Sequence, residues 1–525
     1  MPERRKQNIF YIIILLILFP ALFVNIGKMP LTSDEPTRAV VSLEMNLSGN
    51  YIVPTINGDY YYCKPPLYNW ILAVLFKITH NESEFIIRLP ALLSLIGFAF
   101  TLFFFVKRNL NEKIAIIATL MFITSGRILF YDSLLGLIDL FFSWLTFTGF
   151  IVIYHFSNKQ KYFLLYFLSY LITAIGVLTK GLPSFLFQGI TLLVVFISKK
   201  QFKKLFHWSH FFGIVILFTI VGGYFWVYNK QNSAILYLKS LIFESTQRTP
   251  LEHGIWASVK HILLFPFEQF YHIAPWSLLL LLLLKKGLLK SVLKHPFTKY
   301  CFLLFVSNII VYWISPSTMP RYLFMLYPLL FILLAHLYTE ADNLAPRLKQ
   351  ILLKILIYSA ILVIVAGLAL FFFISPEVSF SFILKLGFII ISLAISAYLM
   401  FKMNGYRIIL FAIILLVLRI GFNWFVIPYR YAMSPEMKYK TDAMNIARLT
   451  KGKKVIIQDY TPLDHLLIFY IEKGKRDILI RQNKPFQKDC FYIIYSQWAP
   501  KLELTSIYDF YTKYDPQLLS LGIKE

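Results

Sequence analysis

The chain has 525 residues, of which 58% are hydrophobic, 18% aromatic and only 15% charged. This composition excludes an ordinary soluble globular protein, because such a fold needs more polar surface than these residues supply. The formal net charge of +25 would suggest a nucleic-acid-binding protein in a soluble chain, but much of the Lys and Arg lies in short loops between apolar runs. That arrangement is the positive-inside pattern of an integral membrane protein.

The first apolar run follows Arg4, Arg5 and Lys6 and predicts a membrane span. The run begins like a signal peptide, but it is about 17 residues long and has no convincing small-residue cleavage site, so we interpret it as a retained span. Further runs of spanning length lie near residues 85–106, 113–131, 134–156, 162–179, 182–198, 210–228, 274–284, 299–315, 322–338, 351–374, 381–401 and 406–427. The sequence therefore predicts about thirteen transmembrane helices.

Basic residues in alternate loops set the orientation of these spans. Clusters such as Lys107-Arg108 and Lys199-Lys200 fall on one side, which the positive-inside rule identifies as the cytoplasm. We expect the protein in the bacterial inner (plasma) membrane. The segments expected on its outer side are residues 28–84, residues 230–273 and the chain beyond about residue 428.

The last part of the chain changes character after residue 430. Residues 436–450 are polar and helix-like, and the alternation that follows predicts a small α/β domain. We therefore expect a transmembrane domain at residues 1–430 and an extracytoplasmic domain at residues 431–525. The chain has no evident internal repeat, which disfavours the architecture of many transporters.

The first outer loop places Asp34, Glu35 and Arg38 directly after the first span. Ionisable groups so close to hydrocarbon are costly, so they indicate a functional site. The segment that opens at Lys64 and ends near Thr79 is short for a span, and its aromatic and apolar face predicts a helix lying in the membrane interface. The segment VVSLEMNL is a second candidate for such a juxtamembrane helix.

A series of motifs then gives a specific resemblance. In chain order they are SGNYIVP, NGDYYYCKPPLYNW, RLPALLS, LIDLFFSW, LTKG, ESTQR, PW and SPSTMPRY. Together they resemble the GT-C glycosyltransferases, in particular the lipid A aminoarabinose transferases and, more distantly, the protein O-mannosyltransferases. The resemblance covers roughly the first 340 residues, and the C-terminal part matches only in being an outer α/β appendage.

The resemblance implies a polytopic, mainly α-helical GT-C fold and an inverting glycosyltransferase. Such an enzyme moves a sugar from a polyprenyl-phosphate donor to an extracytoplasmic acceptor, which can be lipid A, another glycolipid, a glycan or a protein. The reaction needs a carboxylate that accepts the acceptor's proton, cations that stabilise the leaving phosphate, and a greasy groove for the polyprenyl chain. The main alternative is a polytopic transporter or lipid-carrier flippase.

Two carboxylates match the catalytic positions of the family. Asp34 is expected to act as the base and Asp139 as a second catalytic acid residue. Asp34 or Glu35 could instead cap the helix that begins near Pro36, because Asp before Pro-Thr is a good N-cap. Asp139 could instead pair with Arg127 or Arg88.

Five cations are candidates for binding the donor phosphate: Lys64, Arg38, Lys180, Arg248 and Arg321. Lys64 matches the family's phosphate-binding lysine, although a lone interfacial lysine can simply extend to the polar headgroups. Relatives often carry an arginine three residues after the catalytic Asp, where this chain has Thr37, so the resemblance does not settle the role of Arg38. Glu35, Arg88 and Glu244 are further candidates for the site.

A metal site is the most open of these expectations. Some relatives hold structural zinc with a Glu where this chain has Cys63, together with a His of the later outer loop. Cys63 with His253, or with His261 or His272, could bind zinc through thiolate and imidazole. The alternative is a buried thiol beside ordinary interfacial histidines. The expected partners are thus a polyprenyl-phosphate-linked sugar, an outer acceptor and the lipid bilayer, without nucleic acid.

Overall fold

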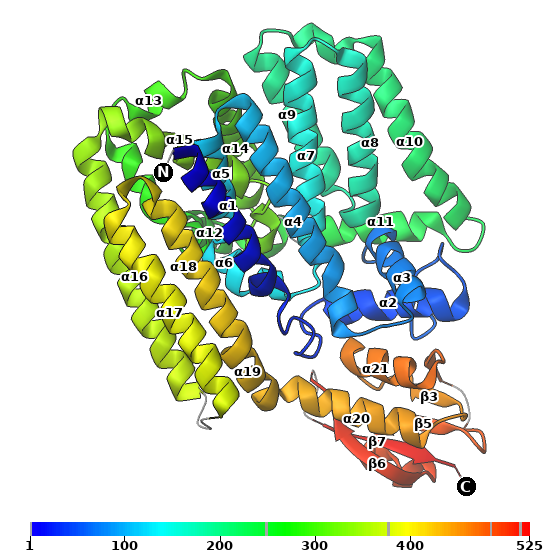
Figure 1. Ribbon diagram of the computed structural model, residues 1–525. Coiled ribbons are helices and arrows are strands. Elements are labelled where there is room, and N and C mark those ends of the chain that lie inside the picture. The colour runs from blue at the N-terminus through cyan, green and yellow to red at the C-terminus, as the bar shows by residue number, and fades with distance from the viewer. Residues whose placement is uncertain (1–2, 247–249, 375–378, 484–485, 514–516, 525) are drawn as a thin grey trace.

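The structure is a computed structural model that describes residues 3–246, 250–374, 379–483, 486–513 and 517–524. Most of these residues form a bundle of helices, and a small α/β domain lies at one end of it (Figure 1). The N-terminus lies toward the opposite end (Figure 1). The expected fold class, a polytopic, mainly α-helical protein with a small C-terminal α/β domain, is confirmed.

The elements of the bundle follow the apolar runs of the sequence. Its helices are α1 (Glu3–Phe23), α4 (Glu84–Asn109), α5 (Glu112–Ile123), α6 (Gly126–Phe130), α7 (Ile138–Asn158), α8 (Tyr162–Lys180), α9 (Pro183–Ser198), α10 (Trp208–Tyr228), α13 (Leu288–Val292), α14 (Pro296–Trp313), α15 (Tyr327–Leu344), α16 (Pro346–Ile374), α17 (Phe380–Lys402), α18 (Arg407–Gly421) and α19 (Ile427–Met433). Shorter 3-10 or π turns are η1 (Asp132–Leu134), η2 (Phe202–Phe206), η3 (Trp276–Leu284), η4 (Pro320–Leu323), η5 (Asn404–Tyr406) and η6 (Phe422–Val426).

The number of spans differs from the sequence-based count. Among the described residues, 8 helices are long and apolar enough to cross a membrane, or up to 10 if each of two bent helix pairs is one span. The expected count of about thirteen is therefore not confirmed. Several expected spans form elements shorter than a full crossing, including α9 and the 3-10 stretch η3.

The first outer loop contains α2 (Glu35–Ser48), the short strands β1 (Thr55–Ile56) and β2 (Asp59–Tyr60), and α3 (Leu67–Thr79). Pro36 in the first turn and Gly49 in a left-handed conformation at the end delimit α2, as expected for a residue without N–H and a residue without Cβ. α2 is buried almost continuously as far as Met45, so it is packed inside the protein rather than lying on the membrane surface. α3 lies beside it.

The later loop between α10 and η3 consists of α11 (Ala234–Thr246) and α12 (Pro250–His272). Tyr237 in α11 donates a hydrogen bond to the carbonyl of Lys64 at 2.6 Å, and Asn232 donates to the hydroxyl of Tyr62 at 2.9 Å. The two expected outer loops therefore contact each other at the same end of the bundle (Figure 1). This contact forms one wall of the cavity described below.

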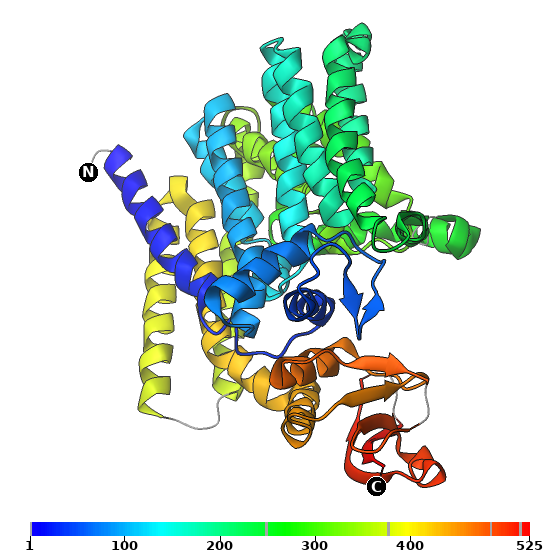
Figure 2. The same ribbon diagram turned by 90° about the vertical axis from the view of Figure 1, so that its right-hand side faces the viewer.

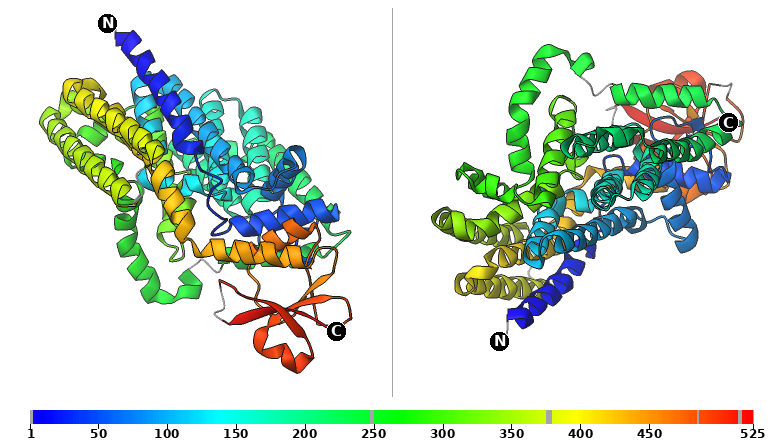
Figure 3. Two further views of the ribbon diagram at one scale, coloured as in Figure 1. Left: turned by 60° about the horizontal axis from the view of Figure 1, so that its bottom comes forward. Right: turned by 90° about the horizontal axis from the view of Figure 1, so that it is seen from above.

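The C-terminal domain contains α20 (Pro435–Leu449), β3 (Val455–Gln458), α21 (His465–Lys475), β4 (Ile480–Gln482), β5 (Phe491–Tyr495), η7 (Ser496–Trp498), η8 (Pro500–Leu502), β6 (Thr505–Tyr511) and β7 (Leu518–Ile523). The sheet order is β4-β3-β5-β7-β6, with β3 parallel to β4 and β5 and the remaining pairs antiparallel. In Figure 3, left, β6 and β7 lie on the side of α20 away from the bundle.

One hydrophobic core joins this domain to the first outer loop. It combines Val40 and Leu43 of α2 and Tyr68 of α3 with Ile446 of α20 and Leu467 of α21, all at most 1% exposed. α21 accordingly lies between the strands of its own domain and α2 (Figure 2). The burial of this shared core fixes the C-terminal domain against the loop that carries Asp34.

Candidate active site

Four charged side chains from distant parts of the chain meet beside the start of α2. Arg321 in η4 donates from Nη2 to Oδ2 of Asp34 at 2.7 Å, and its Nε lies 3.2 Å from Oδ2 of Asp139. The other oxygen of Asp139 accepts from Nζ of Lys180 at 2.5 Å. Asp34, Arg321, Asp139 and Lys180 thus form a chain of alternating charge, which we call the reactive cluster.

The helix ends explain why the reactive cluster forms here. Asp139 lies in the first turn of α7 and Lys180 is the last residue of α8, where helix dipoles favour a negative and a positive charge respectively. Burial disfavours a charged Arg321, yet the carboxylates of Asp139 and Asp34 raise its pKa above the ordinary value. Arg321 is therefore a permanent cation of the site.

Asp34 is the exposed member of this cluster. Its side chain is 63% exposed, whereas the side chains of Arg321, Asp139 and Lys180 are at most 9% exposed. Asp34 stands at the N-cap position of α2, but its carboxylate makes no capping hydrogen bond to any described backbone N–H. The helix-cap alternative thus lacks its hydrogen bond, and the carboxylate is available to a substrate.

Glu35, the next residue, has a different environment. Both of its oxygens accept from Arg88, at 2.7 and 2.9 Å, and they also accept from the backbone N–H groups of Thr32 and Gly136. Arg88 in turn donates to the carbonyls of Ile26, Met29 and Pro30. The side chains of Glu35 and Arg88 are 0% and 2% exposed. We call this pair the structural clasp, because it closes the loop between α1 and α2.

The structure corrects the alternative pairing of Asp139. Asp139 contacts Arg321 and Lys180, while Arg88 is occupied by Glu35 and Arg127 pairs with Asp132 at 2.7 Å. Arg127 and Arg88 are therefore wrong as partners of Asp139, because nearer carboxylates already neutralise both.

Arg38 lies one helical turn after Asp34 and points into the protein. It is 5% exposed, donates from Nη2 to the hydroxyl of Tyr61 and lies over the ring of that residue at 5.3 Å. Its Nη1 atom is buried without a hydrogen-bond partner among the described residues. Arg38 is thus close to the first turn of α2 but is held by Tyr61 rather than by a member of the reactive cluster.

A cavity of about 470 Å³ opens beside the reactive cluster. Its charged lining residues are Lys64, Lys180 and Glu244. The apolar lining residues are Leu182, Pro183, Leu186, Phe187, Leu241, Val311 and Ile314, and the further polar ones are Cys63, Ser245, Tyr312, Ser315, Ser317, Thr318 and Tyr322. Nζ of Lys64 lies 3.9 Å from Glu244 and donates to the carbonyl of the neighbouring Cys63 at 3.1 Å. The cavity therefore combines two ammonium groups and a carboxylate with a largely apolar lining.

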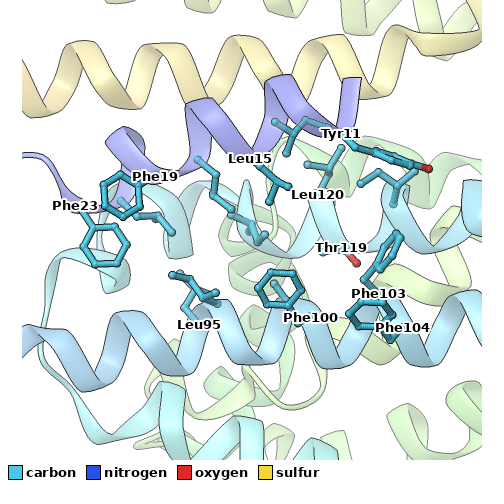
Figure 4. A pocket seen from close by; sticks show the side chains of 17 residues that line it. Tyr11, Leu15, Phe19, Phe23, Leu95, Phe100, Phe103, Phe104, Thr119 and Leu120 are labelled. Atoms are coloured by element: carbon cyan, nitrogen blue, oxygen red, sulfur yellow. The ribbon is translucent and has the colours of Figure 1, made fainter. Parts of the chain in front are cut away.

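A second cavity, of about 380 Å³, lies between α1, α4 and α5 (Figure 4). Residues such as Leu15, Phe19, Leu95 and Phe100 surround it, and Tyr11 and Thr119 are the polar side chains that Figure 4 labels there. No charged residue lines it among the described residues, so it can take hydrocarbon but offers no partner for a phosphate.

The structure leaves the expected zinc pair of Cys63 and His253 untested, because the side chain of His253 is not among those described. Among the residues whose side chains are described, no three His, Cys, Asp or Glu form a group that could hold a metal ion. Burial and the nearby Glu244 raise the pKa of the Cys63 thiol, which disfavours the thiolate that zinc requires. The side chain of His253, in α12, and the whole of Arg248 lie outside the described residues.

One contact of the site involves a residue that sequence reasoning missed. Thr37 in the first turn of α2 forms a hydrogen bond of 2.7 Å with Nδ1 of His465, the first residue of α21. The two residues are separated by 428 positions, and the sequence around His465 has no catalytic motif. The signal that could have found it is the N-cap Asp464 before an apolar helix, which predicts a helix start but not its neighbour.

Comparison with known proteins first defines the class. Residues 63–226 match the family model of dolichyl-phosphate-mannose-protein mannosyltransferases. The fold as a whole matches crystal structures of ArnT from Cupriavidus metallidurans, with a TM-score of 0.71 in the apo state and 0.70 for the form bound to undecaprenyl phosphate. Each match covers 99% of this chain and 98% of the other, at 15% and 16% sequence identity. The chain therefore has the GT-C fold, as the motifs indicated.

Particular relatives narrow this class. The chain is 26% identical over 359 residues to the undecaprenyl phosphate-alpha-4-amino-4-deoxy-L-arabinose arabinosyl transferase of Shewanella sediminis, and 29% identical over 233 residues to such a transferase of Proteus mirabilis. These alignments cover 64% and 43% of this chain, and 62% and 41% of the relatives' own lengths. The resemblance to GT-C glycosyltransferases of the aminoarabinose-transferase and mannosyltransferase type is confirmed.

Proposed function

We propose that this protein is an inverting membrane glycosyltransferase that takes a sugar from a polyprenyl-phosphate donor. The observation that carries the proposal is the position of Asp34, an exposed carboxylate held by Arg321 in a cluster whose Lys180 lines a cavity with two ammonium groups and a largely apolar lining. The relatives named as aminoarabinosyl transferases support undecaprenyl phosphate as the carrier. The resemblance of the motifs to lipid A aminoarabinose transferases makes lipid A one of the acceptors that we propose.

The residues that line the cavity suit both parts of the donor, its phosphate and its polyprenyl chain. Lys64 and Lys180 supply ammonium groups that can donate charge-assisted hydrogen bonds to a phosphate. The apolar lining beyond them, including Leu186 and Phe187, suits the first isoprene units of the carrier.

Asp34 then acts as the general base. One carboxylate oxygen stays with Arg321, and the other accepts the proton of the acceptor's hydroxyl or phosphate group. The acceptor oxygen forms a bond to the anomeric carbon as the bond from that carbon to the carrier's phosphate oxygen breaks. The electron pair of the broken bond leaves with polyprenyl phosphate, whose charge Lys64 and Lys180 stabilise. Attack from the opposite face inverts the configuration of the anomeric carbon.

Asp139 has a supporting role in this scheme. Its two oxygens hold Lys180 and Arg321 in fixed positions, so it sets the distance between the phosphate-binding cation and the base. A buried carboxylate between two cations is itself neutralised, which lets both cations remain in a site of low polarity. Asp139 is therefore proposed as a positioning residue of the catalytic site.

The location of the reaction follows from the loops that form the site. Asp34 and Lys64 belong to residues 28–84 and Glu244 to residues 230–273, which the positive-inside pattern assigns to the outer side of the membrane. We place the active site on the extracytoplasmic face of the inner membrane, with residues 1–430 as the transferase domain and residues 431–525 outside the bilayer. The acceptor is an outer glycolipid, glycan or protein.

The decisive experiment measures release of undecaprenyl phosphate. Purified full-length protein in lipid nanodiscs is incubated with undecaprenyl phosphate carrying aminoarabinose, and in parallel with mannosyl and glucosyl forms, and the lipid products are quantified by mass spectrometry. We expect release from at least one donor in the wild type and in the control Asp59→Asn, an exposed carboxylate of the same loop, but not in Asp34→Asn. If no donor releases undecaprenyl phosphate, but the protein reconstituted in vesicles moves the donor lipid across the bilayer, the protein is instead a flippase.

A further inference from the structure

The C-terminal domain contacts the first outer loop through several polar links besides the shared core. Glu84 accepts from Lys440 and from the hydroxyl of Tyr470, the latter at 2.8 Å. Arg476 donates to both oxygens of Glu82, at 2.7 and 3.1 Å. These links lie near the start of α4 and hold the domain in place, but they do not touch α2, the helix that begins at Asp34.

The contact between His465 and Thr37 is different, because it reaches the first turn of α2. Thr37 lies three residues after Asp34, so the two side chains stand near one another at the helix start. Burial lowers the pKa of His465, opposed by Asp464 and Asp34 and assisted by Arg38. The lowered pKa favours the neutral ring at neutral pH. Nδ1 accepts the hydroxyl hydrogen of Thr37 in the tautomer with its proton on Nε2, and it donates to the hydroxyl oxygen in the other tautomer.

We propose that His465 is a positioning residue for the base: it anchors the first turn of α2 through Thr37 and so holds Asp34 in its catalytic orientation. This inference rests on the proposed function. It gives the C-terminal domain a part in the reaction, although no described residue of that domain lines the cavity that contains Lys64 and Lys180.

The geometry of Asp34 explains why such an anchor is needed. The Asp34 carboxylate makes no capping bond to described backbone, and the residue before it, Ser33, has a left-handed φ of 57°. Arg321 fixes one oxygen of the carboxylate, but a single contact leaves the carboxylate free to turn about it. Glu35 of this turn is held by Arg88, and Thr37 is held by His465 of the C-terminal domain, so loss of His465 removes one of the side-chain anchors of the turn.

The test compares substitutions of His465 that keep or lose a polar group at the position of Nδ1. In His465→Asn the amide oxygen can occupy the position of Nδ1, whereas in His465→Gln the polar group reaches the position of Nε2 and in His465→Ala none is present. Lys440→Met is the control, because it removes a link of the same interface that does not touch α2. Full-length variants are assayed with the donor that the wild type uses, and hydrogen exchange is measured over residues 32–44.

We expect His465→Ala and His465→Gln to lower kcat about tenfold, the size of a modest misplacement of a catalytic group, with little change in KM for the donor. His465→Asn should recover most of the rate, and Thr37→Val should lower it without adding to the effect of His465→Ala. Exchange over residues 32–44 should rise in the Ala variant and not in Lys440→Met.

Two results would overturn the proposal. The first is an Ala variant with normal kcat and normal exchange over residues 32–44, which would make the hydrogen bond incidental. The second is an equal loss in Lys440→Met and His465→Ala without recovery in Asn, which would mean that only docking of the domain matters. The exchange measurement does not depend on turnover, so it decides the positioning role even if no donor tested is used. Absence of turnover in the wild type would instead count against the proposed function.

Discussion

Asp34 and Glu35 are neighbours in sequence, yet they belong to two ion-pair systems with opposite properties. In the structural clasp, both oxygens of Glu35 and all the contacts of Arg88 are directed to nearby protein groups, and both side chains are almost fully buried. In the reactive cluster, Asp34 is 63% exposed and shares only one oxygen with Arg321. The hydrogen-bonding groups of Glu35 and Arg88 are thus directed to buried protein partners, whereas most of the Asp34 side chain faces solvent.

The two systems also depend on each other. The clasp holds Thr32, Gly136 and the carbonyls after α1, and Asp139 follows Gly136 by three residues. It therefore fixes the start of α2 and the start of α7 relative to one another, which are the two helix ends that carry the carboxylates of the reactive cluster. The buried pair of Glu35 and Arg88 thus fixes the position of the exposed Asp34 before a substrate binds, which is the pre-organisation that electrostatic catalysis requires.

The most severe test of this comparison is Asp34→Asn. Asn keeps the size of the side chain but cannot accept the acceptor's proton, so turnover should fall roughly 10²–10⁴-fold. The melting temperature should stay close to that of the wild type, because the carboxylate makes no capping bond to described backbone. Donor turnover and thermal unfolding are measured on the same preparation. An active Asn variant would remove Asp34 from the role of base.

The clasp is tested by Arg88→Met, for which we expect the reverse outcome. It leaves the buried Glu35 without its cation, and breaking such a buried pair costs about 3–5 kcal/mol of stability. The protein should unfold at lower temperature or fail to accumulate, as followed by fluorescence-detected size-exclusion chromatography after heating. A variant as stable as the wild type but inactive would place Arg88 in the chemistry and erase the distinction.

Lys64→Ala tests phosphate binding beside the reactive cluster, and we expect it to have a smaller effect than the two substitutions above. Removing one charge-assisted hydrogen bond to phosphate should cost roughly 1.5–3 kcal/mol of binding. The affinity for undecaprenyl phosphate alone should therefore fall about 10- to 100-fold, measured by the ligand's stabilisation of the protein against heat. Folding should be preserved. Unchanged affinity would show that Lys64 only anchors the loop at the interface.

The smallest effect is expected for Cys63→Ser, at the rim of the same cavity. Among the residues whose side chains are described, Cys63 belongs to no group of three His, Cys, Asp or Glu that could hold a metal ion, so metal analysis by mass spectrometry should give the same low content in wild type and variant. One equivalent of zinc in the wild type that is lost in the variant would show that Cys63 is a ligand after all.

Much of this arrangement could be anticipated from the sequence. The charge count of the loops put Asp34, Lys64 and Arg321 on one side of the membrane, and the motifs gave the GT-C fold that the comparisons bear out. The structure then brings Asp34, Asp139, Lys180 and Arg321 into contact. Their roles in the reaction remain predictions.

What the sequence could not provide are pairings set by tertiary contacts. Glu35 and Arg88 are separated by 53 positions, and nothing in the local pattern shows that Arg88 serves the clasp rather than Asp139. His465 is further still from Thr37, in a domain without a recognisable motif. The span count was less certain for another reason, since apolar composition alone does not tell a full crossing from a shorter or bent helix such as α9 or the pair α5 and α6.

The core shared by α2, α3, α20 and α21 limits how this protein can be rebuilt. A domain that keeps its own core can be exchanged between relatives, but here the core of the C-terminal domain is completed by residues of the first outer loop, among them Val40, Leu43 and Tyr68. Cutting the chain after α19 would leave Val40, Leu43 and Tyr68 facing water. A chimera that takes residues 435–524 from a related protein therefore has to take residues 31–87 from the same protein, because the two segments form one core.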